Sequence, residues 1–297
     1  MRNVLLFCLS VVCLLLTGCE KSIVGEQSEE SALEGNVLLR LSIYEQESFG
    51  TRAVQDIGQW CSRVNVAFFL AGTKVKSASQ ESSFSSFGTV PVSIAAGTYE
   101  VVVVAHNCDG SATITNEETV TFPSNLVTDT FYYYGTLTVS DQQASYDLEL
   151  QRCVAMFRLK IADAIPDDAV KIRFYYTGGS STFSPKKGVG CVNSRQSVML
   201  PMSPSQKVYE VYTLPRADSE TLKMTINCYN DNNDVLNDKD LELTDVPITT
   251  NKITSYTCTM FGGTAEPGSD DPGSGSETSS GLRLSLNGEW GGTISAN

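Results

Sequence analysis

The chain has 297 residues, of which 41% are hydrophobic and 19% are charged, and its formal net charge is −13. This length is enough for two domains of ordinary size. The acidity argues against nucleic acid and anionic lipid headgroups as partners, because both would repel the chain.

Residues 1–18 are predicted to be a lipoprotein signal peptide. Arg2 precedes an apolar run that is too short to span a bilayer, which needs about 20 apolar residues. The run ends in Leu-Thr-Gly-Cys, the pattern in which the Cys thiol receives the lipid. An ordinary signal peptide with an incidental Cys is the alternative. We expect the mature chain to begin at Cys19, palmitoylated and anchored in the outer membrane at the cell surface.

Residues 19–35 follow as an acidic tether without periodicity. Beyond it, apolar and polar residues alternate almost everywhere, which is typical of half-buried strands. The first predicted strand, residues 37–44, directs its apolar side chains to one face, and these are Val37, Leu39, Leu41 and Ile43. Further strands of the first half are predicted at 63–70, 89–94, 98–106, 134–139 and 145–151.

Four consecutive valines, 101–104, predict a central strand that is buried on both faces. Strands of the second half are predicted at 153–162, 170–177, 208–214, 222–229 and 253–260. Gly, Pro, Asn and Asp cluster between these runs and supply turns. We therefore expect an all-β protein with two tandem β-sandwich domains, 36–151 and 152–262, which meet near Gln151.

The C-terminal part is predicted to be a linker rich in Gly, Ser, Pro and acidic residues, 263–280, and a flexible tail strand, 281–297. Leu-Arg-Leu-Ser at 282–285 repeats residues 39–42, and Leu or Ile follows in each copy. The tail could therefore take the place of the first strand, although strands with this alternation also match by chance. The candidate donor residues are Leu282, Leu284, Leu286 and Trp290.

Nine cysteines are present, and six remain after the signal peptide and the lipidated Cys19 are set aside. An oxidising compartment permits disulfides. Cys228 and Cys258, each on a predicted strand of the second half, are a candidate pair. The alternative is that the cysteines are small buried hydrophobes. None has the spacing of a metal site, and we expect neither metal nor cofactor.

Catalytic chemistry is not indicated by the sequence. The single histidine, His106, lies at a strand end with no nucleophile motif, so a hydrogen-bonded structural role is expected. The acidic run 231–234 is interpreted as a turn and not as a calcium loop, because it lacks the ligand spacing. We expect no enzyme.

An aromatic cluster supports an alternative function, that of a surface glycan-binding lipoprotein. Tyr132, Tyr133, Tyr134 and Trp60 would form its sugar-stacking platform. Adjacent residues on a strand point to opposite faces, however, so at most two of the tyrosines share a surface.

Residues 95–107, 150–166 and 174–188, together with the lipobox and tether, resemble the fimbrillin superfamily of type V (Bacteroidia-type) fimbriae. The likeness covers roughly residues 36–262. It implies transthyretin-like sandwiches and a structural role in cell-surface fimbriae and adhesion. The implied partners are other fimbrial subunits, the outer membrane through the lipid, and a receptor on a host or bacterial surface.

The resemblance also implies assembly by donor-strand exchange. In shaft subunits the N-terminus is cut after an arginine, the first strand leaves, and the C-terminal strand of a neighbour fills the groove. Arg52, followed by Ala53, lies after the first strand, so a cut there would release strand and lipid together. Anchor members are not cut, and an uncut loop is the alternative. The tail strand favours the role of a subunit, and the choice between shaft, tip and anchor stays open.

Overall fold

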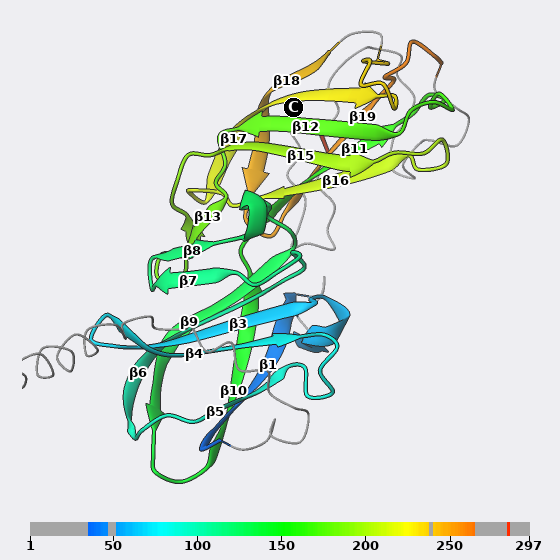
Figure 1. Ribbon diagram of the computed structural model, residues 1–297. Helices are drawn as coiled ribbons and strands as arrows, with labels where there is room; N and C mark the ends of the chain where they lie inside the picture. Colours follow the sequence, from blue (N-terminus) through cyan, green and yellow to red (C-terminus); the bar gives the residue numbers. More distant parts are fainter. Residues whose placement is uncertain (1–34, 47–51, 238–239, 265–283, 286–297) are drawn as a thin grey trace, which may run out of the picture.

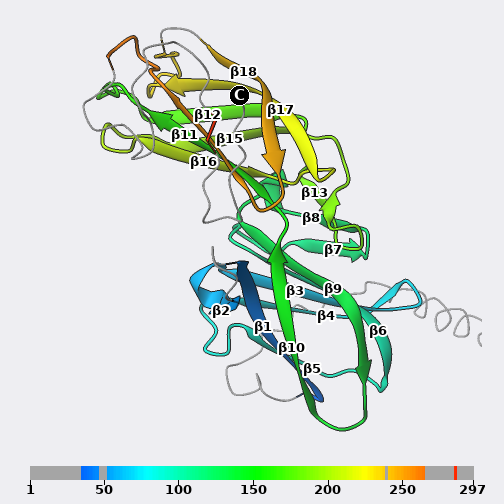
Figure 2. The same cartoon turned by 180° about the vertical axis from the view of Figure 1, so that it is seen from behind.

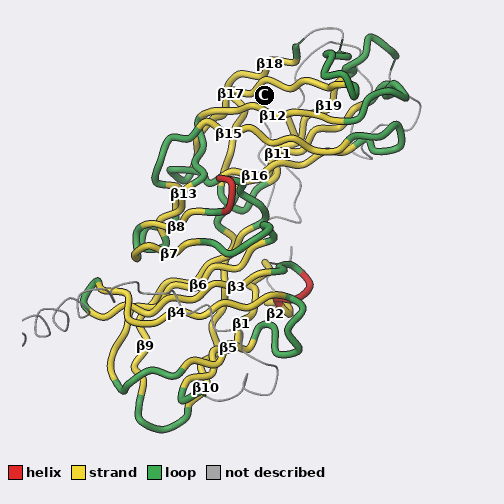
Figure 3. The backbone as a smooth tube through the Cα atoms, in the orientation of Figure 1, coloured by secondary structure: helices red, strands yellow, loops and turns green. Residues whose placement is uncertain are grey.

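The structure, a computed structural model, describes residues 35–46, 52–237, 240–264 and 284–285. These residues lie in strands and loops apart from two short 3-10 turns, η2 (Ile57–Gln59) and η3 (Pro123–Asn125) (Figure 3). The predicted all-β class is confirmed. In this part of the chain no helix has the length and apolarity that a membrane span requires.

The first half is built around one long sheet, in the order β2-β1-β10-β9-β6-β3-β4, with β5 paired to β1 (Figure 1). β9 and β10 pair at only two positions, so the sheet bends there into two layers that face each other. The strands are β1 (Val37–Gln46), β2 (Arg52–Asp56), β3 (Arg63–Leu70), β4 (Thr73–Glu81), β5 (Thr89–Val92), β6 (Gly97–His106), β9 (Thr130–Val139) and β10 (Ala144–Arg152).

β6 occupies the centre of this half, as its valines predicted. Val101 and Val103 point into the core between the two layers, and Val102 and Val104 point into a second core on the other face. All four are fully buried. A strand with both faces covered carries apolar side chains at every position, and this is why period-two alternation stops there.

The second half contains two four-stranded sheets, β16-β11-β19-β20 and β15-β12-β17-β18 (Figure 2), and they enclose their own hydrophobic core. The alternating strand β12 contributes Ile172, Phe174 and Tyr176 to this core. The strands are β11 (Ala155–Ile161), β12 (Lys171–Thr177), β15 (Arg195–Pro201), β16 (Val208–Thr213), β17 (Ser219–Tyr229), β18 (Leu241–Thr249), β19 (Ile253–Cys258) and β20 (Leu284–Ser285).

A fourth sheet joins the two halves. Two of its strands come from the first half, β7 (Thr113–Asn116) and β8 (Thr119–Thr121), and two from the second, β13 (Thr182–Ser184) and β14 (Val189–Gly190). β8 pairs with β13 across the join, and both views show β7, β8 and β13 between the halves (Figures 1 and 2). The third core also draws on both halves, so the join is a packed interface and not a linker.

Candidate functional site

The first strand, β1, is held on both sides. One side pairs in parallel with β10, from Val37 opposite Ala144 to Ile43 opposite Leu150. The other side pairs with β5 along its first part and with β2 along its second part. If β1 left, the polar backbone edges of all three neighbouring strands would lose their partners, so the vacated slot would be a template for another strand.

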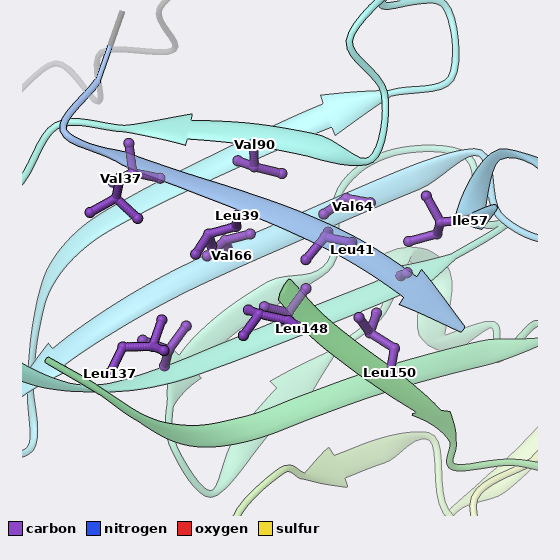
Figure 4. Close-up of a cluster of buried hydrophobic side chains, with 14 of the residues drawn as sticks. Val37, Leu39, Leu41, Ile57, Val64, Val66, Val90, Leu137, Leu148 and Leu150 are labelled. Carbon is purple, nitrogen blue, oxygen red and sulfur yellow. The ribbon is translucent and has the colours of Figure 1, made fainter. Parts of the chain in front are cut away.

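The alternate side chains of β1 form part of the core of the first half. Val37, Leu39, Leu41 and Ile43 are all buried, as predicted. Figure 4 shows the first three of them among Val64, Val66, Leu148 and Leu150 from the facing and neighbouring strands. Burial of one such side chain contributes about 1.5–3 kcal/mol. The four together contribute roughly 6–12 kcal/mol, which is comparable with the whole stability of a domain.

Polar contacts fix the register of β1. At its start, the Asn36 side chain donates to the Ile94 carbonyl (2.7 Å) and accepts from the Ile94 N–H (3.0 Å). In its middle, the Leu41 N–H donates to the Gly88 carbonyl (2.8 Å). Sequence reasoning missed Asn36, because one Asn before a strand is not a distinctive signal. A strand that replaces β1 has to meet the same register, since a one-residue slip would turn its leucines outward.

The predicted cleavage site lies at the next strand. Arg52 is the first residue of β2, and Ala53 is the second. Arg52 is paired with Gln46 at the end of β1, and Ala53 with Glu45. A cut between Arg52 and Ala53 would therefore separate β1 from the rest of the chain while it left most of β2 in place.

The predicted donor strand is described at two residues only, which form β20. Leu284 lies opposite Tyr256 and Ser285 opposite Ser255, so β20 is an antiparallel edge strand beside β19 in the second half. Leu282, Leu286 and Trp290 lie outside the described residues, as does Cys19. Within the sequence match, Leu284 corresponds to the buried Leu41.

The six cysteines of the described chain are free thiols in the structure. Cys228 on β17 is buried, and its thiol lies 3.6 Å from the sulfur of Met260. Burial, as the largest cause, raises the pKa of Cys228 and of Cys258 to about 12. Both thiols are therefore protonated and unreactive at neutral pH. The bridge between Cys228 and Cys258 stays a prediction.

The aromatic residues of the alternative function do not share one surface. Tyr133 packs on the core of the first half, whereas Tyr132 and Tyr134 pack on the core at the join. The Tyr132 ring meets Phe183 edge to face at 4.7 Å, and Tyr134 donates to Glu100 at 2.6 Å. Trp60 lies against the Arg152 guanidinium at 5.6 Å. Each of these rings is partly buried and contacts another residue of the protein.

The acidic run 231–234 is a turn, as predicted. Asn233 has a φ of 68°, and the side chain of Asn230 accepts from the Asp234 N–H at 2.9 Å. Asn and Asp side chains that bond to nearby backbone groups favour turns. Across the described ranges, no group of three or more His, Cys, Asp or Glu residues is placed to hold an ion.

His106 is fully buried at the end of β6 and has a structural role. The Cys108 N–H donates to its Nδ1 (3.1 Å), so the ring proton lies on Nε2, which donates to Asn65 Oδ1 (3.1 Å). Burial, and then the charge of Arg63, lower the pKa of His106 from 6.5 to about 4. The ring is therefore neutral at pH 7, held between one donor and one acceptor.

We expect the stability of the protein to fall as the pH is lowered from about 6.5 to about 4. The unfolded chain binds a proton at His106 in this window and the folded chain does not, so protonation favours unfolding. A pKa shift of this size is worth about 3 kcal/mol. Urea unfolding at pH 7 and pH 4 should show a loss that is larger by about this amount for the wild type than for His106→Gln. Equal losses in the two proteins would contradict the assignment.

The chain was compared with known proteins. The family model for fimbrillin-A associated anchor proteins Mfa1 and Mfa2 matches residues 27–261. No curated protein sequence is significantly similar to the chain. Among solved structures, a candidate polysaccharide-binding protein from Bacteroides thetaiotaomicron has a TM-score of 0.50 at 9% identity. The match covers 89% of this chain and 99% of that one, and it supports the fold alone.

Two further structures come from Porphyromonas gingivalis. The fimbrial anchor protein Mfa2 has a TM-score of 0.38 at 10% identity, covering 74% of this chain and 90% of that one. The tip fimbrial protein Mfa3, with a C-terminal truncation, has a TM-score of 0.40 at 10% identity, covering 84% and 98%. The family model spans most of the chain and includes the first strand and both halves. The protein therefore belongs to the Bacteroidia-type fimbrillin family of fimbrillin-A associated anchor proteins Mfa1 and Mfa2.

Proposed function

We propose that this protein is a lipid-anchored precursor or base component of a surface fimbrium, and that it joins other subunits by donor-strand exchange. Its two halves would be transthyretin-like sandwiches, and Cys19 would carry the lipid in the outer membrane. The observation that carries the proposal is β1, a strand paired on both sides that contributes four buried side chains to its half. The tail repeats the sequence of that strand.

The exchange would conserve both kinds of stabilisation that β1 provides. A strand inserted beside β10 restores the backbone pairing, and its alternate leucines fill the same part of the core. With Leu284 in the place of Leu41, Leu282 and Leu286 fall at the places of Leu39 and Ile43. The linker of roughly 15 residues reaches about 50 Å when extended, which is enough to cross to a neighbouring subunit.

Deletion of residues 281–297 is expected to leave folded monomers that no longer assemble. Within the described residues the tail contributes the two-residue edge strand β20, and its loss leaves the pairing of β19 with β11 in place. High-mass, SDS-resistant ladders of surface-sheared material would be measured in gels, and circular dichroism would verify the fold. Ladders that are unchanged by the deletion would refute donor-strand exchange through this tail.

Mass spectrometry of the same material separates a cut subunit from an anchor. A mature N-terminus at Ala53 within the ladders is the result expected of a shaft or tip subunit. A lipidated Cys19 at the N-terminus of every molecule would identify an anchor. Protein with neither terminus at the cell surface would contradict the proposed lipoprotein.

A further inference from the structure

The outer face of the sheet β15-β12-β17 is positively charged, although the chain as a whole is acidic. Alternate residues of β12 point into the core, so Lys171, Arg173 and Tyr175 point to solvent. Residues directly opposite each other on antiparallel strands share a face. The partners of β12 on its outer face therefore extend this surface, which we call the basic face, and it comprises Lys171, Arg173, Tyr175, Arg195, Met199 and Lys223.

The four cations of the basic face, Lys171, Arg173, Arg195 and Lys223, take part in no ion pair within the described chain. Lys171 donates to the neutral side chain of Asn233, so its charge is not compensated. Four unneutralised cations on one side of three adjacent strands attract an anion, and they do so in a protein with a formal net charge of −13.

Arg173 at the centre of the face has an unsatisfied donor. Its Nε is buried and has no hydrogen-bond partner. Its guanidinium stacks over the Tyr175 ring, with 5.5 Å between the Cζ atom and the ring centroid. Stacking holds the planar group in place, and a fixed guanidinium is suited to a carboxylate or a sulfate. Because this Nε is closed off from solvent, a ligand on the surface pairs with the terminal nitrogens of the guanidinium instead.

The dimensions of the face limit what can bind there. Neighbouring strands lie about 4.8 Å apart, and residues on one face of a strand repeat about every 6.8 Å. From β15 to β17, and from Thr177 to Lys171, the face therefore measures roughly 10 by 20 Å. A stable protein interface needs about 800 Å² on each partner, several times this area. The narrow, elongated shape of the basic face is, by contrast, well suited to an extended polymer chain.

We propose that the basic face binds a linear anionic polysaccharide, whose carboxylate or sulfate groups pair with Arg173, Arg195 and Lys223. The exposed Met199, with 51% of its surface accessible, lies opposite Arg173 and offers an apolar contact to a sugar ring. Asp240, whose carboxylate accepts from Asn227 on β17, and Glu242, opposite Thr225, repel the ligand from the β18 side. The ligand therefore runs over β15 and β12 and reaches β17 at Lys223. Physiological salt screens charges farther than about 8 Å away, so the local cations outweigh the net charge.

The experiment measures binding of the purified full chain to four polymers by titration calorimetry. Heparin carries sulfates, polygalacturonate carries carboxylates, dextran is neutral, and poly-L-glutamate represents an acidic protein segment. The test variant is Arg173→Gln/Arg195→Gln/Lys223→Gln. The control variant, Lys76→Gln/Lys186→Gln/Lys187→Gln, removes the same charge from exposed positions outside the basic face. Because Arg173 is half-buried, the double variant Arg195→Gln/Lys223→Gln guards against a folding defect.

We expect heparin or polygalacturonate to bind the wild type, and the Kd to rise about tenfold or more in the triple variant. The double variant should show an intermediate loss, and the control should stay within about twofold. The stronger of the two ligands identifies sulfate or carboxylate as the preferred group. Equal losses in test and control variants, equal binding of dextran, binding of poly-L-glutamate alone, or no binding at all would each overturn the proposal. Fibre ladders report on assembly separately, so the two proposals fail independently.

Discussion

Replacement of Arg152 by methionine is expected to reduce the free energy of unfolding by about 3–5 kcal/mol. Arg152, the last residue of β10, holds Asp129 with two hydrogen bonds of 2.8 and 3.0 Å. A third bond of 3.0 Å reaches Asn251 in the second half. The guanidinium also lies 4.6 Å from the ring centre of Phe131. Methionine fills the space of the side-chain stem but leaves the Asp129 carboxylate without its partner.

Burial makes this loss large. The side chains of Arg152 and Asp129 are only 7% and 13% exposed. Burial raises the pKa of Asp129, and the guanidinium lowers it in opposition. Removal of one member of the pair leaves the other as an uncompensated buried charge. Removal of both members leaves no buried charge. The double variant Arg152→Met/Asp129→Leu should therefore recover most of the stability that the single variant loses, as measured by urea unfolding.

Arg40→Met is the matched control for this prediction. Arg40 on β1 pairs with Asp147 on β10 at 2.9 Å, but the two side chains are 57% and 79% exposed. An exposed pair of this kind contributes about 0–1 kcal/mol. If Arg152→Met destabilised the protein no more than Arg40→Met, the pair at the join would have no special role.

The sequence predicted those strands whose side chains alternate between core and solvent. Residues 63–70 are β3, and the strand predicted at 98–106 is β6 with one residue added. β4 was missed, because it is an exposed edge strand in which only Gln80 is buried. An edge strand with both faces in solvent needs no apolar residues, so its sequence carries no periodic signal.

β18 was missed for a different reason. Its buried residues Leu243 and Val246 are three positions apart, because the strand is irregular opposite Leu222 and Met224. Asp245 takes a φ of 56° at this irregularity. A β-bulge shifts the inward face by one residue, so a search for period two fails across it.

The candidate site was predictable in its side chains and not in its pairing. Alternation identified Val37, Leu39, Leu41 and Ile43 as buried residues. The parallel partner β10 lies about a hundred residues away in the sequence. The sequence of β1 does not indicate that its other side pairs with two strands, β5 and β2. The sheet between the halves was equally hidden, because β8 and β13 are three-residue strands that meet at Thr121 and Thr182.

Leu41→Asp is expected to destabilise the first half by about 4 kcal/mol or more, because it places a carboxylate in an apolar core. Leu41 is 7% exposed and packs in the core between the two layers. Leu38→Asp, on the outward face of the same strand, should cost about 1 kcal/mol. Thermal and urea unfolding of the two variants would measure the difference. Equal effects would mean that the inward leucines of β1 do not hold this half together.

The Leu41→Asp variant also allows strand exchange to be measured as the binding of a peptide. A weakened β1 competes poorly for its slot, so a labelled peptide GLRLSLNGEW, residues 281–290, should bind the Leu41→Asp protein and raise its melting temperature. The wild type should bind the peptide far more weakly, because its own strand fills the slot with four buried side chains. Fluorescence anisotropy gives the affinity. The control is the peptide with Leu284→Asp, because it places a carboxylate at the position that Leu41 occupies in the wild type. If that control peptide bound as well as the parent, or if both proteins bound the parent equally, the tail would not be a substitute for the first strand.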